Sequence, residues 1–182
     1  SHPYNLSLFA TVVERLGDAK GDDWLKGVVA NMARAPKGGD TDQIKAVASG
    51  ECGVALTNTY YVARMIKSSK PEDRSVMEKV RVVFPNQGTS GTHVNIAGAA
   101  VAKHAKNKDN AIAFMEFLAS PFAQDYFANG NNEFPAVKGL KVDNPAIKAM
   151  GGDNFKAEQI PLGVVAKNMT KVQQMLDRAG YK

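Results

Sequence analysis

The sequence predicts an α/β fold in which helices alternate with a few short buried strands. Two observations lead to this prediction. Apolar residues recur at helical spacing along most of the chain, and three short apolar runs interrupt the helical pattern. The composition, 44% hydrophobic and 23% charged over 182 residues, is typical of a globular protein with a substantial core.

The first third of the chain predicts three helices. Residues 5–19 carry Leu6, Phe9 and Val13 at helical spacing, and Gly17 or Gly21 ends that helix. Residues 22–35 form a second helix, followed by a loop rich in proline and glycine. A third, short helix runs through residue 49 and is capped by Asp40 or Thr41.

The middle of the chain alternates between strand and helix. The apolar or β-branched runs at 53–57, 80–84 and 94–102 predict buried strands. Helices are expected at 59–68 and 71–79, the second with a proline in its first turn. Three or four strands make a thin sheet for this many helices, so we expect this chain to hold part of a larger sheet.

The last third predicts helices at 109–119, 120–130 and 167–179. The second of these begins with a serine cap followed by proline and is closed by Gly130. Residues 131–139 and much of 143–163 have no helical or strand period, and we interpret them as loops.

Several function classes are disfavoured by composition and motifs. One cysteine excludes an internal disulfide and a multi-cysteine metal site. The net charge of +5 is spread along the chain without a basic stripe carrying aromatics, which argues against nucleic-acid binding. No nucleophile, metal-protease or phosphate-loop motif is present. The three scattered histidines are interpreted as surface or hydrogen-bonded residues and not as catalytic ones: His2, His93 and His104.

The unusual feature is the pair Tyr60–Tyr61, which follows a predicted buried strand and opens a predicted helix. At such a turn both hydroxyls can point toward one place outside the strand end, where open α/β sheets bind ligands. Tyr4 repeats this pattern, because it stands just before the first helix. Phenolates are hard anionic ligands that suit ferric iron, and three of them would neutralise its charge. The alternative is that both rings simply pack the helix start with their hydroxyls in solvent.

Six stretches together resemble the periplasmic ferric-iron-binding proteins, the substrate-binding components of iron ABC transporters. The first is NTYYVAR at residues 58–64, which contains the tyrosine pair. The others are DQIKAVASGEC (42–52), FPNQ (84–87), GTHVNI (91–96), GNNEFP (130–135) and DRAG (177–180). The resemblance extends over nearly the whole chain.

This resemblance implies the site and its cargo. Tyr4, Tyr60 and Tyr61 match the family's iron-binding tyrosines, with Asn58 and Arg64 as supporting or anion-binding residues. The ligand implied is Fe3+, with a synergistic anion such as carbonate. The function implied is binding, not catalysis: periplasmic delivery of ferric iron to an ABC-transporter permease. We expect coordination by this chain to be incomplete or absent.

The family's fold is a two-lobed type II periplasmic binding protein, with a mixed sheet flanked by helices in each lobe. By this resemblance the chain is a C-terminal fragment that consists mainly of the second lobe. Residues 1–87 would belong to lobe 2, residues 88–140 would return to lobe 1, and residues 141–182 would pack on lobe 2. Because most of the N-terminal lobe is missing, apolar residues such as Ile112 and Phe117 would be exposed. They would cause dimerisation, segment exchange or association with the missing lobe.

Two alternatives remain at this point. One is a binding protein of the same fold for another small solute, such as a phosphonate, a polyamine or an inorganic anion. The other is a small α/β enzyme that uses a tyrosine as general acid, although no base or nucleophile lies near Tyr60 in the sequence.

Overall fold

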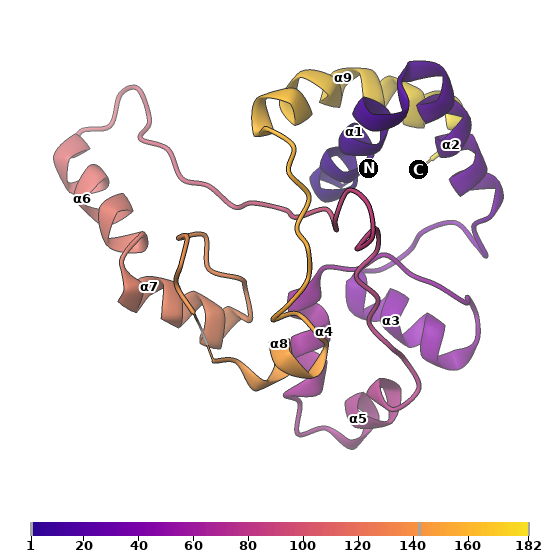
Figure 1. The fold of residues 1–182 in the computed structure, drawn as a ribbon, viewed down its shortest axis with the longest axis horizontal. Helices are drawn as coiled ribbons and strands as arrows, with labels where there is room; N and C mark the ends of the chain where they lie inside the picture. Colours follow the sequence, from indigo (N-terminus) through magenta and orange to yellow (C-terminus); the bar gives the residue numbers. More distant parts are fainter. Residues whose placement is uncertain (1, 142, 182) are drawn as a thin grey trace. The chain divides into compact units, whose positions relative to one another are not determined.

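The structure is a computed structural model that describes residues 2–141 and 143–181 (Figure 1). By their contacts the residues group into two compact units. The first unit contains the chain up to Lys37, the segment Val83–Asn95 and the chain from Phe155 onward. The second unit contains Gly38–Val82 and Ile96–Asn154. The lobe boundaries at residues 87 and 140, expected from the resemblance, stay a prediction.

Three helices build the first unit: α1 (Pro3–Leu16), α2 (Asp18–Ala30) and α9 (Leu162–Ala179). Each packs against the other two. Their facing apolar side chains make one core, whose buried members include Phe9, Val13, Leu25, Val172 and Leu176. Phe9 also meets the edge of the Trp24 ring at 5.7 Å between centroids.

Glycines fix how α1 meets α2. Gly17 is the single residue between α1 and α2, and its φ is +77°. This backbone conformation favours glycine because a Cβ would be strained there. Gly21 lies so close to α1 that a Cβ on it would be 2.9 Å from Cγ2 of Val13. The expected first helix, residues 5–19, therefore ends at the first of the two glycines proposed for it.

The second unit contains the remaining helices. One group packs around α4 and consists of α3 (Asp40–Ser49), α4 (Thr59–Ile66), α5 (Pro71–Met77) and α8 (Pro145–Ala149). Next come α6 (Lys108–Leu118), α7 (Pro121–Tyr126) and the π-helical turn η1 (Phe127–Asn131). No side chain of α6 is buried. Phe114 and Phe117 of α6 and Phe122 of α7 are exposed as a row of neighbouring rings.

The predicted strands are wrong for the described residues. Residues 53–57, 80–84 and 94–102 form no strand there, and the β pairing that the structure shows is one isolated parallel bridge between Thr92 and Ala157. A strand requires a neighbour to accept its backbone hydrogen bonds. The apolar side chains of these runs are largely uncovered, as in Val54 (83% exposed) and Val83 (78% exposed). Among the residues that the structure describes, the mixed sheet implied by the resemblance is therefore not formed.

The predicted helices are present, with shifted ends. Helix α9 begins five residues before the predicted start at 167, and the predicted helix 120–130 becomes α7 followed by η1. Helix α8 lies in a stretch that we interpreted as loop. Its cap is Asn144, whose side chain accepts hydrogen bonds from the backbone N–H groups of Ala146 and Ile147.

Candidate functional site

Tyr60 and Tyr61 occupy the first turn of α4, where their rings lie against each other. The ring centroids are 4.4 Å apart and the ring planes meet at 35°. Both residues are half-buried. The next residues of the helix, Val62 and Ala63, are buried among the neighbouring helices. The core of the second unit therefore holds the helix whose start carries two adjacent phenol groups.

Arg64 lies beside this pair. Its guanidinium carbon is 5.4 Å from the centroid of the Tyr61 ring, within the range of a cation–π contact. The three-residue separation brings the two side chains together on the surface of a helix. Arg64 is exposed, so its positive charge faces solvent next to the tyrosines.

Asn58 is held by a carboxylate from another helix. It is the N-cap residue of α4 and has extended backbone angles, but its side chain makes no cap hydrogen bond. Instead its amide Nδ2 donates to Oδ1 of Asp40 at 3.2 Å, and its backbone N–H donates to the same oxygen at 2.7 Å. The hydroxyl of Thr57 donates to that oxygen as well, at 3.0 Å.

Tyr4 belongs to the first unit, in the first turn of α1. Its side chain is 40% exposed. The ring of His2 lies 4.1 Å from the Tyr4 ring, centroid to centroid, and Nδ1 of His2 accepts a hydrogen bond from the Tyr4 backbone N–H at 3.3 Å. His2 is thus the cap of the helix that carries Tyr4, with Pro3 in its first turn as helix starts prefer.

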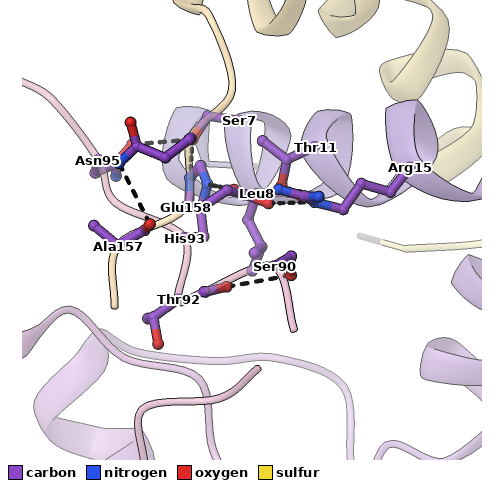
Figure 2. A network of polar contacts seen from close by, with 12 residues as sticks. Ser7, Leu8, Thr11, Arg15, Ser90, Thr92, His93, Asn95, Ala157 and Glu158 are labelled. Carbon is purple, nitrogen blue, oxygen red and sulfur yellow. Dashed lines mark hydrogen bonds and ion pairs between the residues drawn. The ribbon is translucent and has the colours of Figure 1, made fainter. Parts of the chain in front are cut away.

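A polar network begins one turn along α1, at Ser7, and joins this helix to His93 and Glu158 within the first unit (Figure 2). The hydroxyl of Ser7 donates to the backbone carbonyl of Tyr4 at 2.9 Å, and it lies 3.3 Å from Nε2 of His93. Nδ1 of His93 lies 3.0 Å from Oε2 of Glu158. The histidine therefore links the helix turn of Tyr4 to a carboxylate far away in sequence. His93 is hydrogen-bonded, which agrees with the interpretation made from the sequence.

Glu158 is the centre of this network. Its side chain is 7% exposed, and its second oxygen accepts a hydrogen bond from Nε of Arg15 at 2.7 Å. Burial raises the pKa of the Glu158 carboxyl. The hydrogen bonds from Arg15 and His93 and their positive charges outweigh burial, so the pKa lies below its ordinary value.

The structure thus brings four of the five predicted site residues together within the second unit: Asn58, Tyr60, Tyr61 and Arg64. Tyr4 is in the first unit. The sequence pattern does not reveal Asp40 as a partner of Asn58. Asp40 lies 18 residues before Asn58, and its position at the start of a predicted helix indicates a helix cap. In the described part of the chain, no three His, Cys, Asp or Glu side chains gather as a metal-binding group.

A family model now identifies the class of protein. The model for bacterial extracellular solute-binding proteins matches residues 2–151, so the chain belongs to that family. Among curated proteins it is similar to iron uptake protein A2 of Synechocystis, with 43% identity over all of this chain and 52% of the relative. It is also similar to the major ferric iron-binding protein of Neisseria meningitidis. That match has 30% identity over 130 residues and covers 71% of this chain and 38% of the relative.

Solved structures agree in fold. The Trichodesmium protein FutA (IdiA), solved in complex with iron and citrate, superposes with a TM-score of 0.91 and 46% identity, over 98% of this chain and 56% of that one. The ferric binding protein from Campylobacter jejuni gives a TM-score of 0.91 and 37% identity, over 99% and 56%. The expected fold class, that of type II periplasmic binding proteins, is confirmed, apart from the sheet.

The chain spans about half the length of the iron uptake protein and of these two solved structures. The relatives named here are uptake or binding proteins by name, which fits a binding function. Within the described residues no helix has both the length and the apolar content needed to cross a bilayer.

Proposed function

We propose that this chain supplies the phenolates of Tyr4, Tyr60 and Tyr61 as ligands for ferric iron, in a periplasmic protein that delivers iron to an ABC-type permease. The observation that carries the proposal is the contact between the Tyr60 and Tyr61 rings, 4.4 Å apart at the start of α4. The chain in which it occurs is 43% identical to an iron uptake protein. None of the observations above favours a phosphonate, a polyamine or an inorganic anion as the cargo.

The chemistry of the tyrosines suits this cargo. Ferric iron is small and triply charged, and it binds oxygen anions in preference to softer ligands. Each tyrosine loses its hydroxyl proton when it binds, so binding releases protons and depends on pH. Three phenolates balance the three charges of the ion. Arg64, next to Tyr61, adds a positive charge that stabilises a phenolate or a synergistic anion such as carbonate.

The affinity of this chain for iron is expected to be low. The relatives are about twice as long, so the chain offers part of the ligand set that a complete protein of this family would supply. In the complete protein, closure of two lobes around the ion would add the remaining ligands and exclude water. Transfer to the permease would follow reopening.

A ferric titration of the 182-residue chain tests the proposal. Iron is added as the nitrilotriacetate chelate, and visible absorbance reports the phenolate-to-iron charge-transfer band. The ultraviolet difference spectrum reports phenolate formation independently of that band. With the ferric chelate in large excess, which offsets the low affinity, we expect both signals in the unsubstituted chain and loss of most of the visible band in Tyr60→Phe and Tyr61→Phe. Tyr4→Phe decides separately whether Tyr4 is a ligand.

Tyr126→Phe is the matched control. Tyr126 is an exposed tyrosine on α7 in the same unit as the pair, so its loss should leave both signals unchanged. If Tyr60→Phe and Tyr61→Phe retained the full band, or if Tyr126→Phe removed as much of it, the assignment of the pair would be wrong.

A further inference from the structure

The segment that leads into α4 has few backbone contacts of its own. Within the described part of the chain, no backbone–backbone hydrogen bond outside the helices involves residues 53–57. These residues were expected to be a strand, whose ladder would have fixed the position of the following turn. Another contact must therefore hold the residues directly before Tyr60 and Tyr61.

Asp40 provides this contact. Its Oδ1 accepts three hydrogen bonds from two consecutive residues: from the backbone N–H of Asn58 at 2.7 Å, from the hydroxyl of Thr57 at 3.0 Å and from the amide of Asn58 at 3.2 Å. Hydrogen bonds to a carboxylate are stronger than those between neutral groups. One oxygen thus fixes both the backbone and the side chain of the residue that caps α4.

Asp40 is itself held in place. It is the first residue of α3, and a carboxylate in the first turn of a helix is stabilised by the positive end of the helix dipole. Helix α3 packs on α4 and α5, and its buried residues are Ile44 and Ala46. Asp40 therefore connects the starts of two packed helices, and the start of α4 is the turn that carries the two phenol rings.

We propose that Asp40 is a positioning residue for the tyrosine pair: it fixes the first turn of α4 so that both phenol oxygens can bind the same ion. This inference rests on the proposed function. Asp40 acts through Asn58, and it is not itself a ligand. Loss of the carboxylate would free the turn and raise the cost of holding both phenolates at one ion.

Asp40→Ala is the direct test, and Asp42→Ala is its matched control. Asp42 is also a first-turn carboxylate of α3, but its Oδ2 accepts a hydrogen bond from the backbone N–H of Gly39, at the start of its own helix. We expect Asp40→Ala to lower ferric affinity about tenfold and to shift the charge-transfer maximum. Asp42→Ala should lower thermal stability without either effect. Asp40→Asn, which keeps an acceptor oxygen, should restore much of the affinity.

Equal ferric affinity and equal band position in Asp40→Ala and Asp42→Ala would overturn the inference. An Asp40→Asn variant with a ferric affinity as low as that of Asp40→Ala would also overturn the inference. The negative charge of Asp40, and not the position that its oxygen gives to Asn58, would then determine the affinity. If Asp40→Ala does not fold, Thr57→Val replaces it: this variant loses one of the three hydrogen bonds to Asp40, so its ferric affinity should fall below that of Asp42→Ala, and an equal affinity would overturn the inference. A band lost in Tyr60→Phe but unchanged in Asp40→Ala would reject the positioning role and retain the proposed function. An unsubstituted chain without any ferric signal would overturn both.

Discussion

Nε of Arg15 donates a hydrogen bond to Oε1 of Glu158 over 2.7 Å, across 143 residues of sequence. The other oxygen of Glu158 lies 3.0 Å from Nδ1 of His93. A single carboxylate thus joins α1 to two segments that come much later in the chain. Since its side chain is almost completely buried, its protonation state matters for the stability of the first unit.

We predict that the first unit loses stability in acid through Glu158. Because the pKa of Glu158 is lower in the folded chain than its ordinary value of 4.5, its contribution to stability is complete above that value. The contribution is lost as the pH falls through the lower, folded-state pKa. Thermal unfolding between about pH 7 and pH 3 should therefore show a smaller acid-induced decrease in Tm for Glu158→Gln than for the unsubstituted chain.

At neutral pH, Glu158→Ala should cost about 1.5–3 kcal/mol, because Arg15 and His93 both lose a charged partner. Glu116→Ala, on α6, changes the same residue type in a helix with no buried side chain and should cost less than about 0.5 kcal/mol. The acid prediction would be contradicted if Tm fell equally with pH in Glu158→Gln and in the unsubstituted chain.

The contact between α1 and α2 gives a second prediction. Gly21→Ala should lower the free energy of unfolding by about 1–3 kcal/mol, because the new Cβ would be 2.9 Å from Cγ2 and 3.1 Å from Cα of Val13. Gly27→Ala in the same helix meets nothing within 4 Å, so it should stabilise the helix by about 0.5–1 kcal/mol. Urea unfolding measures both. The prediction fails if the two substitutions change stability in the same direction.

Asn144 gives a third prediction, in the second unit. Its buried side chain accepts from the first N–H groups of α8 and donates to the carbonyl oxygen of Ala128 and to Oδ1 of Asn132. Asn144→Ala should cost about 2–3 kcal/mol because these buried groups lose their partner. Asn144→Asp keeps the cap but loses both donors, and the new carboxylate would face two oxygens.

Asn144→Asp should therefore also destabilise the protein, and most strongly at neutral pH, where the carboxylate is charged. Acid should reduce the difference between Asn144→Asp and the unsubstituted chain, since a protonated carboxyl can donate once. Chemical denaturation at two pH values tests this expectation. A stability of Asn144→Asp equal to that of the unsubstituted chain at neutral pH would show that the two donor contacts contribute little.

The exposed rings of α6 and α7 give a fourth prediction. Phe122 is 74% exposed and lies beside Phe117, which in turn lies beside Phe114. We expect the chain to self-associate through these rings, because contiguous apolar surface is rarely left in water. Sedimentation velocity should show a concentration-dependent mass that Phe114→Ser combined with Phe122→Ser reduces. A monodisperse monomer at all concentrations would contradict this expectation.

The sequence was a good guide to helices and a poor guide to strands. Helical period depends on residues close in sequence, so α3 and α9 could be predicted. The expected cap of α3, Asp40 or Thr41, is wrong because Gly39 is the N-cap, and α9 begins earlier than predicted. The run at 53–57 has a strand-like composition, but a strand forms when another strand pairs with it, and no local pattern reports that partner. Helix α8 was missed because its five residues are too few to show a period, and its stability depends on the buried contacts of Asn144.

The candidate site shows the same division. Tyr60, Tyr61 and Arg64 are neighbours in sequence, so helical spacing was enough to bring them together. The link between Asp40 and Asn58 depends on how α3 packs against α4, which the sequence does not reveal. The pairing of Arg15 with Glu158 is of the same kind, since each residue alone is an ordinary charged surface residue.

The junction at Gly17 determines where the chain can change in length. Gly17 is both the C-cap of α1 and the N-cap of α2, so no loop between the helices can absorb a change in length. A residue inserted into α2 before Leu25 would rotate the rest of that helix by about 100° and turn Leu25 out of the core. Related proteins should therefore keep this hairpin at constant length. Insertions and deletions should gather instead in irregular, exposed stretches such as residues 97–107.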